Sequence, residues 1–151
     1  MHDLLELLTD ERDAILDNAA VALERSNLRH YAQDGAETSR QRLADLLALV
    51  VASISARDLV PMVDHATKVA TERFAGGFDI SEVQCAFNVL EEAIWARVVE
   101  ATAPRELAQS IGMVGTVLGA GRDALARTYV SLASHQHVPT LDLTALFRGG
   151  T

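Results

Sequence analysis

Residues 40–54 read RQRLADLLALVVASI, and this stretch decides the fold class. Its large apolar residues recur every three or four positions: Leu43, Leu46, Leu47, Val50, Val51 and Ile54. Because an α-helix turns once every 3.6 residues, this spacing places them all on one face. The charged residues Arg40, Arg42 and Asp45 lie near the start of the stretch. The pattern predicts a long amphipathic helix that packs against a core on one side.

The residues before this stretch predict two further helical segments. Residues 10–26 carry apolar side chains at helical spacing, with Thr9 as the expected N-cap and acidic residues in the first turn. The leucine-rich residues 4–8 predict a short lead-in helix. Residues 27–35 are polar and end in glycine, so they predict a turn.

Start and stop signals divide the next part of the chain. Residues 58–74 predict a helix whose first turn tolerates a proline, and Gly76 and Gly77 end it. Asp79 and Glu82 then form the D-x-x-E pattern of a capping box, which starts another helix. The sequence therefore predicts a tight helix–turn–helix junction here.

The last helix follows a break at residues 102–104. Its apolar residues keep a near-heptad spacing: Leu107, Ile111, Val114, Leu118, Leu125 and Leu132. We expect one helical domain over residues 1–138 and a C-terminal tail over 139–151. The apolar residues of the tail predict one docked turn: Leu143, Leu146 and Phe147.

These patterns predict an all-α fold of five to six helices and no strand. Short connections indicate neighbouring helices that are mostly antiparallel. The pattern leaves open whether the helices form a simple bundle or a globin-like crossed arrangement.

Composition excludes several function classes. Of 151 residues, 49% are hydrophobic, which is enough to build a core. The net charge of −8 argues against binding to nucleic acid or to anionic lipid, because nothing offsets the repulsion of phosphates. No apolar stretch approaches the roughly 20 residues that span a bilayer. The N-terminus lacks the basic start of a signal peptide, and Cys85 has no partner for a disulfide, so we expect a cytoplasmic protein.

Three glycines inside the last predicted helix suggest a close helix contact. Gly112, Gly115 and Gly119 each cost about 1 kcal/mol relative to alanine in a helix interior. Close approach of another helix backbone would offset that cost, either within the chain or across a homodimer. The candidate dimer interface combines these glycines with a neighbouring apolar seam: Val114, Leu118 and Leu125.

His65 and Lys68 offer the main chemical alternative. Their H-x-x-K spacing resembles that of phosphotransfer bundles, although Val69 stands where a small glycine usually follows the lysine. A role for His65 as a haem ligand is disfavoured by the few aromatic residues available to line a haem pocket. His135 and His137 lack the further ligands that a metal site needs, so we expect no metal and no cofactor.

A ligand pocket between helices is the other alternative. Its candidate lining residues are the aromatic side chains Phe87, Trp95 and Tyr129, which would equally suit an ordinary core. The adjacent carboxylates Glu91 and Glu92 point in different directions on a helix, so they form no catalytic dyad. The chain also lacks a nucleophile elbow, a phosphate loop and a zinc signature. We therefore expect a protein that is not an enzyme.

Three stretches together resemble a known family. They are residues 30–54, the block RFAGGFDISEV at 73–83, and residues 88–95. They resemble the RsbRD-N family, the N-terminal domains of RsbR-type co-antagonists in the bacterial stressosome, over roughly residues 10–134. The resemblance implies a globin-like helical fold without haem that dimerises and serves as an input or interaction module.

The sequence departs from that family at its C-terminus. RsbR-type proteins continue into a STAS domain that carries phosphorylated threonines, whereas this sequence ends at Thr151. We expect that a kinase-substrate role tied to that domain does not carry over. The leading hypothesis is a dimeric sensory or regulatory module that docks an unidentified protein partner.

Overall fold

The computed structural model describes residues 3–137, which form seven α-helices and no strand. The helices are α1 (Leu4–Asp10), α2 (Arg12–Arg25), α3 (Arg29–Asp34), α4 (Ala36–Ala56), α5 (Val60–Ala75), α6 (Ile80–Ala101) and α7 (Pro104–His137). The all-α prediction is confirmed, but the predicted number of five to six helices is too low. The predicted C-terminal tail, with its docked turn, lies outside the described residues.

The additional helix is α3, which occupies part of the segment predicted as a turn. Asn27, with a φ of 52°, lies in the turn that follows α2, and Gly35, with a φ of 91°, separates α3 from α4. Between them α3 has room for less than two turns, and Tyr31 is its one buried residue. The expected cap at Thr9 is wrong, because Thr9 lies inside α1 and its hydroxyl donates to the Leu5 carbonyl at 2.9 Å.

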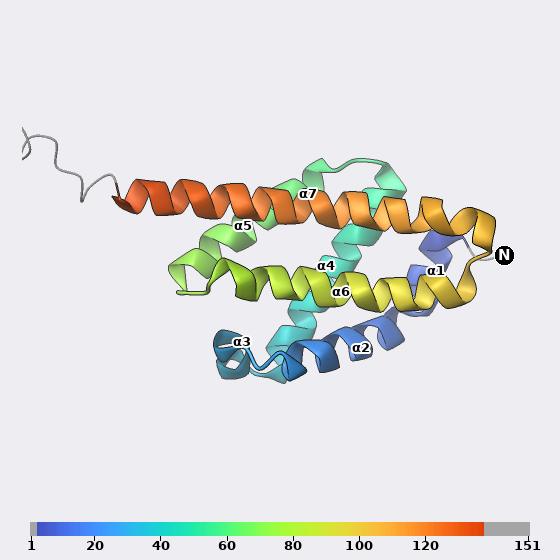
Figure 1. The fold of residues 1–151 in the computed structure, drawn as a ribbon, viewed down its shortest axis with the longest axis horizontal. Coiled ribbons are helices and arrows are strands. Elements are labelled where there is room, and N and C mark those ends of the chain that lie inside the picture. Colours follow the sequence, from blue (N-terminus) through green and yellow to red (C-terminus); the bar gives the residue numbers. More distant parts are fainter. Residues whose placement is uncertain (1–2, 138–151) are drawn as a thin grey trace, which may run out of the picture.

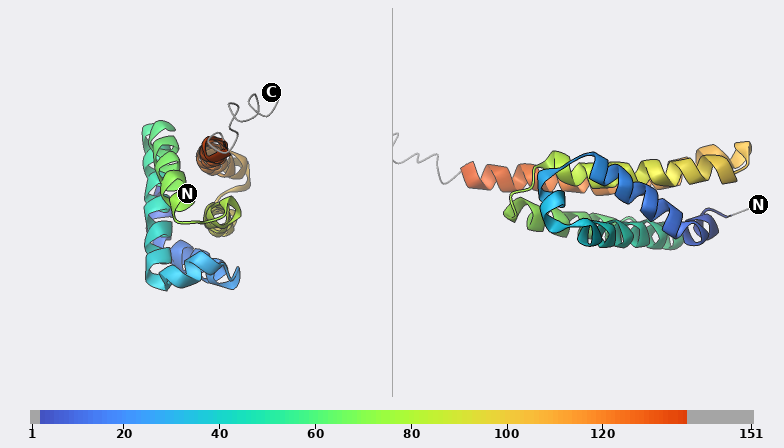
Figure 2. Two further views of the ribbon diagram at one scale, coloured as in Figure 1. Left: turned by 90° about the vertical axis from the view of Figure 1, so that its left-hand side faces the viewer. Right: turned by 90° about the horizontal axis from the view of Figure 1, so that it is seen from below.

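The helices are arranged around an antiparallel hairpin made of α6 and α7 (Figure 1). Helix α2 packs along α6, and α5 packs along α7. Helix α4 crosses behind the hairpin at a steep angle, and the end-on view in Figure 2 shows α4 and α5 on one side of it. The arrangement is therefore a hairpin with a crossing helix and not a simple up-and-down bundle.

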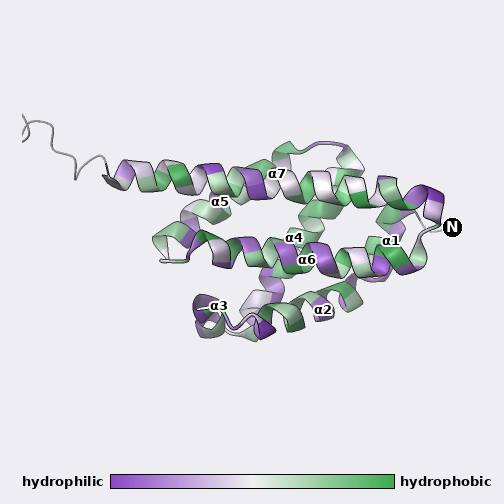
Figure 3. Cartoon of the chain, viewed as in Figure 1, coloured by the Kyte–Doolittle hydropathy of each residue, from purple (hydrophilic) through white to green (hydrophobic). Residues whose placement is uncertain are grey.

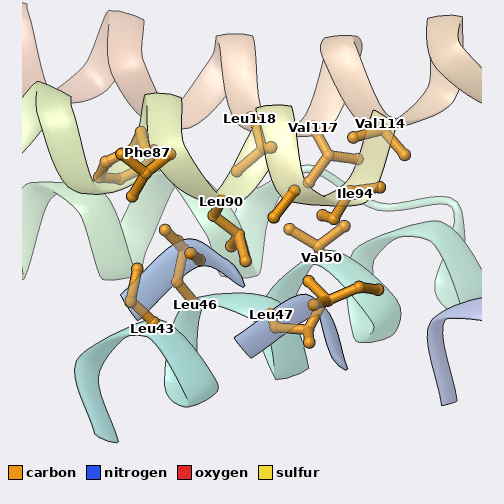
Figure 4. Close-up of a cluster of buried hydrophobic side chains, with 14 of the residues drawn as sticks. Leu43, Leu46, Leu47, Val50, Phe87, Leu90, Ile94, Val114, Val117 and Leu118 are labelled. Atoms are coloured by element: carbon orange, nitrogen blue, oxygen red, sulfur yellow. The ribbon is translucent and has the colours of Figure 1, made fainter. Parts of the chain in front are cut away.

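The core forms where α4 meets the hairpin. Figure 4 shows Leu43 and Val50 of α4 facing Leu90 of α6 and Leu118 of α7, and all four are at most 1% exposed. The predicted apolar stripe is buried through Val50, whereas its last members, Val51 and Ile54, are half-buried. Figure 3 shows how apolar and polar residues alternate along the helices.

The α5–α6 junction follows its predicted signals. Helix α5 ends at Ala75, and Gly77 has a φ of 82°, which only glycine adopts readily. Asp79 and Glu82 form the complete capping box. This junction fixes the start of α6 close to α3. Among residues 3–137, no helix combines the length and the apolar character that a bilayer-spanning segment needs.

Candidate ligand-binding site

A cavity of about 230 Å³ opens between helices α3, α4, α5 and α6. Its lining residues are Tyr31, Arg42, Asp45, Leu46, His65, Lys68, Val69, Glu72, Arg73, Val83, Ala86 and Phe87. Two other hollows on the described surface measure about 380 and 370 Å³. Each has only one charged residue among its lining residues, Glu24 in the first and Arg127 in the second. Ionisable groups therefore gather at the smallest of these three hollows.

Buried apolar side chains form the inner wall of the cavity. Leu46, Val83 and Phe87 are at most 4% exposed. They come from α4 and α6, where the helical periodicity that builds the core also turns them inward. Tyr31 of α3 adds a phenol ring, and burial raises the pKa of its hydroxyl to about 12. That hydroxyl therefore stays protonated at neutral pH and is able to donate a hydrogen bond.

Two arginines lie against one aromatic ring beside this wall. The guanidinium carbons of Arg42 and Arg73 lie 5.8 and 5.7 Å from the centroid of the Phe78 ring. Their side chains are only 26% and 15% exposed. Arg42 donates to Asp34 at 2.6 Å, whereas the nearest carboxylate of Arg73 is its chain neighbour, at 3.7 Å.

The guanidinium of Arg73 lacks its full set of partners. Its Nε is buried and forms no hydrogen bond within the described part of the chain. Such a donor costs about 1–3 kcal/mol when it is left unsatisfied. Packing on Phe78, more than hydrogen bonding, holds this cation beside the cavity.

Lys68 and His65 complete the polar rim. Lys68 is the one lysine in the sequence and is exposed at the cavity, and none of the ion pairs of the described residues includes it. Burial lowers the pKa of His65, and the charges of Lys68 and Arg73 lower it further, while Asp45 and Glu72 act in the opposite direction. The imidazole of His65 is therefore neutral at neutral pH.

A partly buried hydrogen-bonded pair, His30 and Glu82, fixes the helix α3 end of the cavity. The Nδ1 of His30 lies 2.8 Å from Oε1 of Glu82, and the His30 amide donates to Oε2 at 3.2 Å. Burial alone would raise the pKa of Glu82, but hydrogen bonds from the Asp79 amide and from His30 outweigh burial and lower the pKa. Glu82 is thus ionised at neutral pH and ties α3 to the start of α6.

Phe78 connects the His30–Glu82 pair to the two arginines. The His30 ring stacks on Phe78 with centroids 4.6 Å apart. The Phe78 carbonyl accepts a hydrogen bond from the Tyr129 hydroxyl at 3.0 Å, which anchors the α5–α6 turn to α7. Contacts from the cavity's own helices and one hydrogen bond from α7 therefore hold Phe78 in place.

The predicted aromatic pocket does not form as a unit. Phe87 lines the cavity, but Trp95 is 36% exposed on α6, and Tyr129 is 9% exposed and packs edge-on against Phe74. The three aromatic side chains therefore lie in different surroundings and do not face a common space. Neither Trp95 nor Tyr129 lines any of the three hollows described above.

The predicted phosphotransfer pair does come together, since His65 and Lys68 line the same cavity. Asp45 and Glu72 line it too, and their charges reach His65. A dianionic phosphoryl group on His65 would be repelled by both carboxylates. Phosphotransfer therefore has less support than ligand binding.

The two arginines and Tyr31 were missed as site residues. In the sequence, Arg42 stands out only as a charged residue near the start of a helix, and Arg73 only as part of the block 73–83. A one-turn spacing within α5 signals the pairing of His65 with Lys68. No local signal pairs Arg42 with Arg73, because the packing of α4 and α5 around Phe78 brings them together.

The candidate dimer interface is divided between surface and core. An added Cβ at Gly112, Gly115 or Gly119 would meet no atom of residues 3–137 within 4 Å, so packing among these residues does not explain the three glycines. The residues of the predicted apolar seam are 0% exposed and lie in the core, so they offer no free surface to a partner. They are Val114, Leu118 and Leu125.

No group of three or more His, Cys, Asp or Glu side chains able to hold a metal occurs among the residues that the structure describes. His135 contacts the Ser131 carbonyl at 2.7 Å, one helical turn earlier.

Comparison of the chain with protein-family models, with curated proteins and with solved structures found no match. The resemblance to the RsbRD-N family therefore stays an expectation from the sequence.

Proposed function

We propose that the protein is a non-enzymatic regulatory module whose input is a small molecule bound in the cavity between α3, α4, α5 and α6. The observation that carries this proposal is the cavity itself. It joins a buried apolar wall to a rim of ionisable side chains. Ligand sites commonly combine these two features, because apolar surface supplies affinity and a few polar groups supply orientation.

The position of the cavity supports a regulatory role. Its walls come from four helices, so a ligand would contact elements that are far apart in the sequence. One of them, α3, is held to α6 mainly through the His30–Glu82 pair. A ligand that prefers one arrangement of α3 would shift the population toward that arrangement. The surface that a protein partner binds would change together with the position of α3.

The resemblance to the RsbRD-N family also favours a regulatory role. It motivates the finer part of the proposal: a cytoplasmic module of bacterial stress signalling that acts through a protein partner. We expect no chemical turnover of the ligand.

A second candidate function is homodimerisation through the outer face of α7. Gly112, Gly115 and Gly119 lie at i, i+3 and i+7, and their open surroundings leave the cost of three helix glycines without an internal compensation. A second copy seated on this face would supply it. Light scattering after size exclusion would test this candidate: a dimer that Gly115→Leu converts to a folded monomer supports it, and a monomer at all concentrations excludes it.

A cavity-blocking variant tests the main proposal. Ala86 lines the cavity on α6, and Ala86→Phe would fill it, whereas Ala96→Phe places the same side chain at an exposed site on the same helix. We would screen a small-molecule library by thermal shift and confirm the hits by ¹H–¹⁵N NMR. Ligands of the cavity should stabilise the wild type and Ala96→Phe but not Ala86→Phe. A library without hits, or hits that ignore Ala86→Phe, would overturn the proposal.

A further inference from the structure

We propose that the cavity recognises a small organic monocarboxylate, with its apolar body against Phe87 and its carboxylate between Arg42, Arg73 and Lys68. This inference rests on the proposed function and names the class of ligand. It is argued from three features of the site: the arrangement of the cations, the positions of the acidic side chains, and the size and polarity of the inner wall.

The cations are arranged as an incomplete anion site. Arg42 and Arg73 both pack against the Phe78 ring, so two positive charges are held near one aromatic side chain and largely out of water. Asp34 offsets the charge of Arg42, but Arg73 has only a distant contact with its exposed chain neighbour. A carboxylate that approached from the cavity would accept charge-assisted hydrogen bonds and reduce the repulsion between the arginines.

Lys68 adds a third cation at the rim. It is exposed and free of ion pairs among the described residues, although it belongs to a chain with a net charge of −8. This lysine lies at the edge of the cavity together with Asp45 and Glu72, and a bound anion there would be its partner.

The acidic side chains limit the charge of the ligand. Asp45 and Glu72 line the same cavity, but both are exposed, and the Glu72 side chain is 52% exposed. They therefore lie toward solvent, while the arginines lie deeper. A single negative charge placed deep in the cavity avoids them, whereas phosphate or a dicarboxylate would bring a second charge within their reach.

The apolar wall and the volume limit the rest of the ligand. Leu46, Val83 and Phe87 offer a surface that an inorganic anion could not use. The volume of about 230 Å³ lies below the roughly 300–1,000 Å³ that is typical of sites for drug-sized ligands. A single ring or a short branched chain with one carboxylate fits these limits.

Three aromatic probes of matched size and differing charge, benzoate, benzamide and benzylamine, test the inference, together with inorganic phosphate as an anion without an apolar body. We would titrate each at constant ionic strength into ¹⁵N-labelled protein and map the shifted amides. We expect benzoate to bind at the cavity at least about tenfold more tightly than benzamide, because hydrogen bonds to charged groups are stronger than neutral ones. Benzylamine and phosphate should bind more weakly still.

Substitutions of the cations provide the second test. Arg73→Met should remove most of the preference for benzoate over benzamide, and Lys68→Met should reduce it. Lys68 is exposed, so its variant keeps the test valid if Arg73→Met fails to fold. Arg127→Met is the matched control, because the Arg127 side chain on α7 is 69% exposed. This variant should leave the preference for benzoate over benzamide unchanged.

The single lysine gives an independent readout. Benzoate should protect Lys68 from acylation by an amine-reactive ester, measured on the peptide that contains it by mass spectrometry, and benzamide should not. Acylation of the α-amino group serves as the internal control, and its extent should be the same with and without benzoate.

The possible outcomes separate this inference from the proposed function. Equal binding of benzoate and benzamide at the cavity, or tighter binding of benzylamine or phosphate, would overturn the monocarboxylate inference and leave ligand binding intact. Failure of benzoate alongside library hits that Ala86→Phe abolishes would have the same meaning. Failure of benzoate together with an empty library screen would overturn both.

Discussion

The glycines of α7 allow a quantitative test of how this helix is used. In a monomer, a methyl group added at Gly112, Gly115 or Gly119 meets no atom of the described part of the chain within 4 Å, so it creates no clash there. Each alanine should then contribute its full helix propensity, about 1 kcal/mol of added stability. The triple alanine variant should gain about 2–3 kcal/mol in the free energy of unfolding, provided that the sites act independently.

Gly121 supplies the matched control on the same helix. Its added Cβ would lie 2.7 Å from Phe87 and 3.0 Å from the sulfur of Met62. Overpacking of a well-filled core costs about 1–3 kcal/mol, which cancels or exceeds the gain in helix propensity. Gly121→Ala should therefore be neutral or destabilising by up to about 2 kcal/mol.

Urea unfolding followed by circular dichroism, at several protein concentrations, would measure these differences. Stabilisation of the triple variant with unchanged solution mass would mean that the glycine face is open to solvent. Stabilisation at low concentration together with loss of a dimer would mean that a second copy covers this face. A triple variant that is a monomer and less stable than the wild type would refute the reasoning, because something within the chain must then pack on these glycines.

Three further predictions concern polar contacts in the core. Glu82→Gln should lower the free energy of unfolding by about 1–3 kcal/mol at neutral pH, because it weakens the contact with His30. Folding lowers the pKa of the Glu82 carboxyl, so urea titrations should show this difference in stability fading as the pH falls through and below the usual glutamate pKa near 4.5. Arg122→Met should cost about 3–5 kcal/mol, because it leaves the 9%-exposed Glu91 without its partner at 3.3 Å, and a thermal melt of Arg122→Met/Glu91→Leu should recover most of the loss. Tyr129→Phe should cost about 1 kcal/mol by chemical denaturation, since it removes one hydrogen bond to the α5–α6 turn; a neutral effect would mean that this bond does not anchor the turn.

Periodicity predicted the parts of this fold that bury a continuous face. The stripe of α4 and the capping box of α6 are both confirmed, because each signal lies within one segment of sequence. Helix α3 was missed because only Tyr31 among its residues is buried, so it has no apolar stripe to detect. Its stability depends on the contact between His30 and Glu82, which are 52 residues apart.

The candidate site shows the same division between local and distant signals. His65 and Lys68 were identified because a spacing of three residues places them on one helix face. Arg42 and Arg73 meet only through the packing of α4 and α5, so no spacing rule pairs them. The glycine spacing marked α7 as unusual, but sequence alone could not assign Gly121 to the inside and Gly115 to the outside.

Trp95, the sole tryptophan of the chain, gives the molecule a built-in optical reporter. It follows Phe87 by eight residues on α6, which is about 12 Å along the helix axis, and its indole is 36% exposed. It does not line the cavity, so a ligand there has no direct contact through which to quench it. If ligand binding changes the tryptophan emission or its quenching by iodide, the change would therefore report a movement transmitted along α6. Stopped-flow fluorescence would then measure the rate of that movement without an added label.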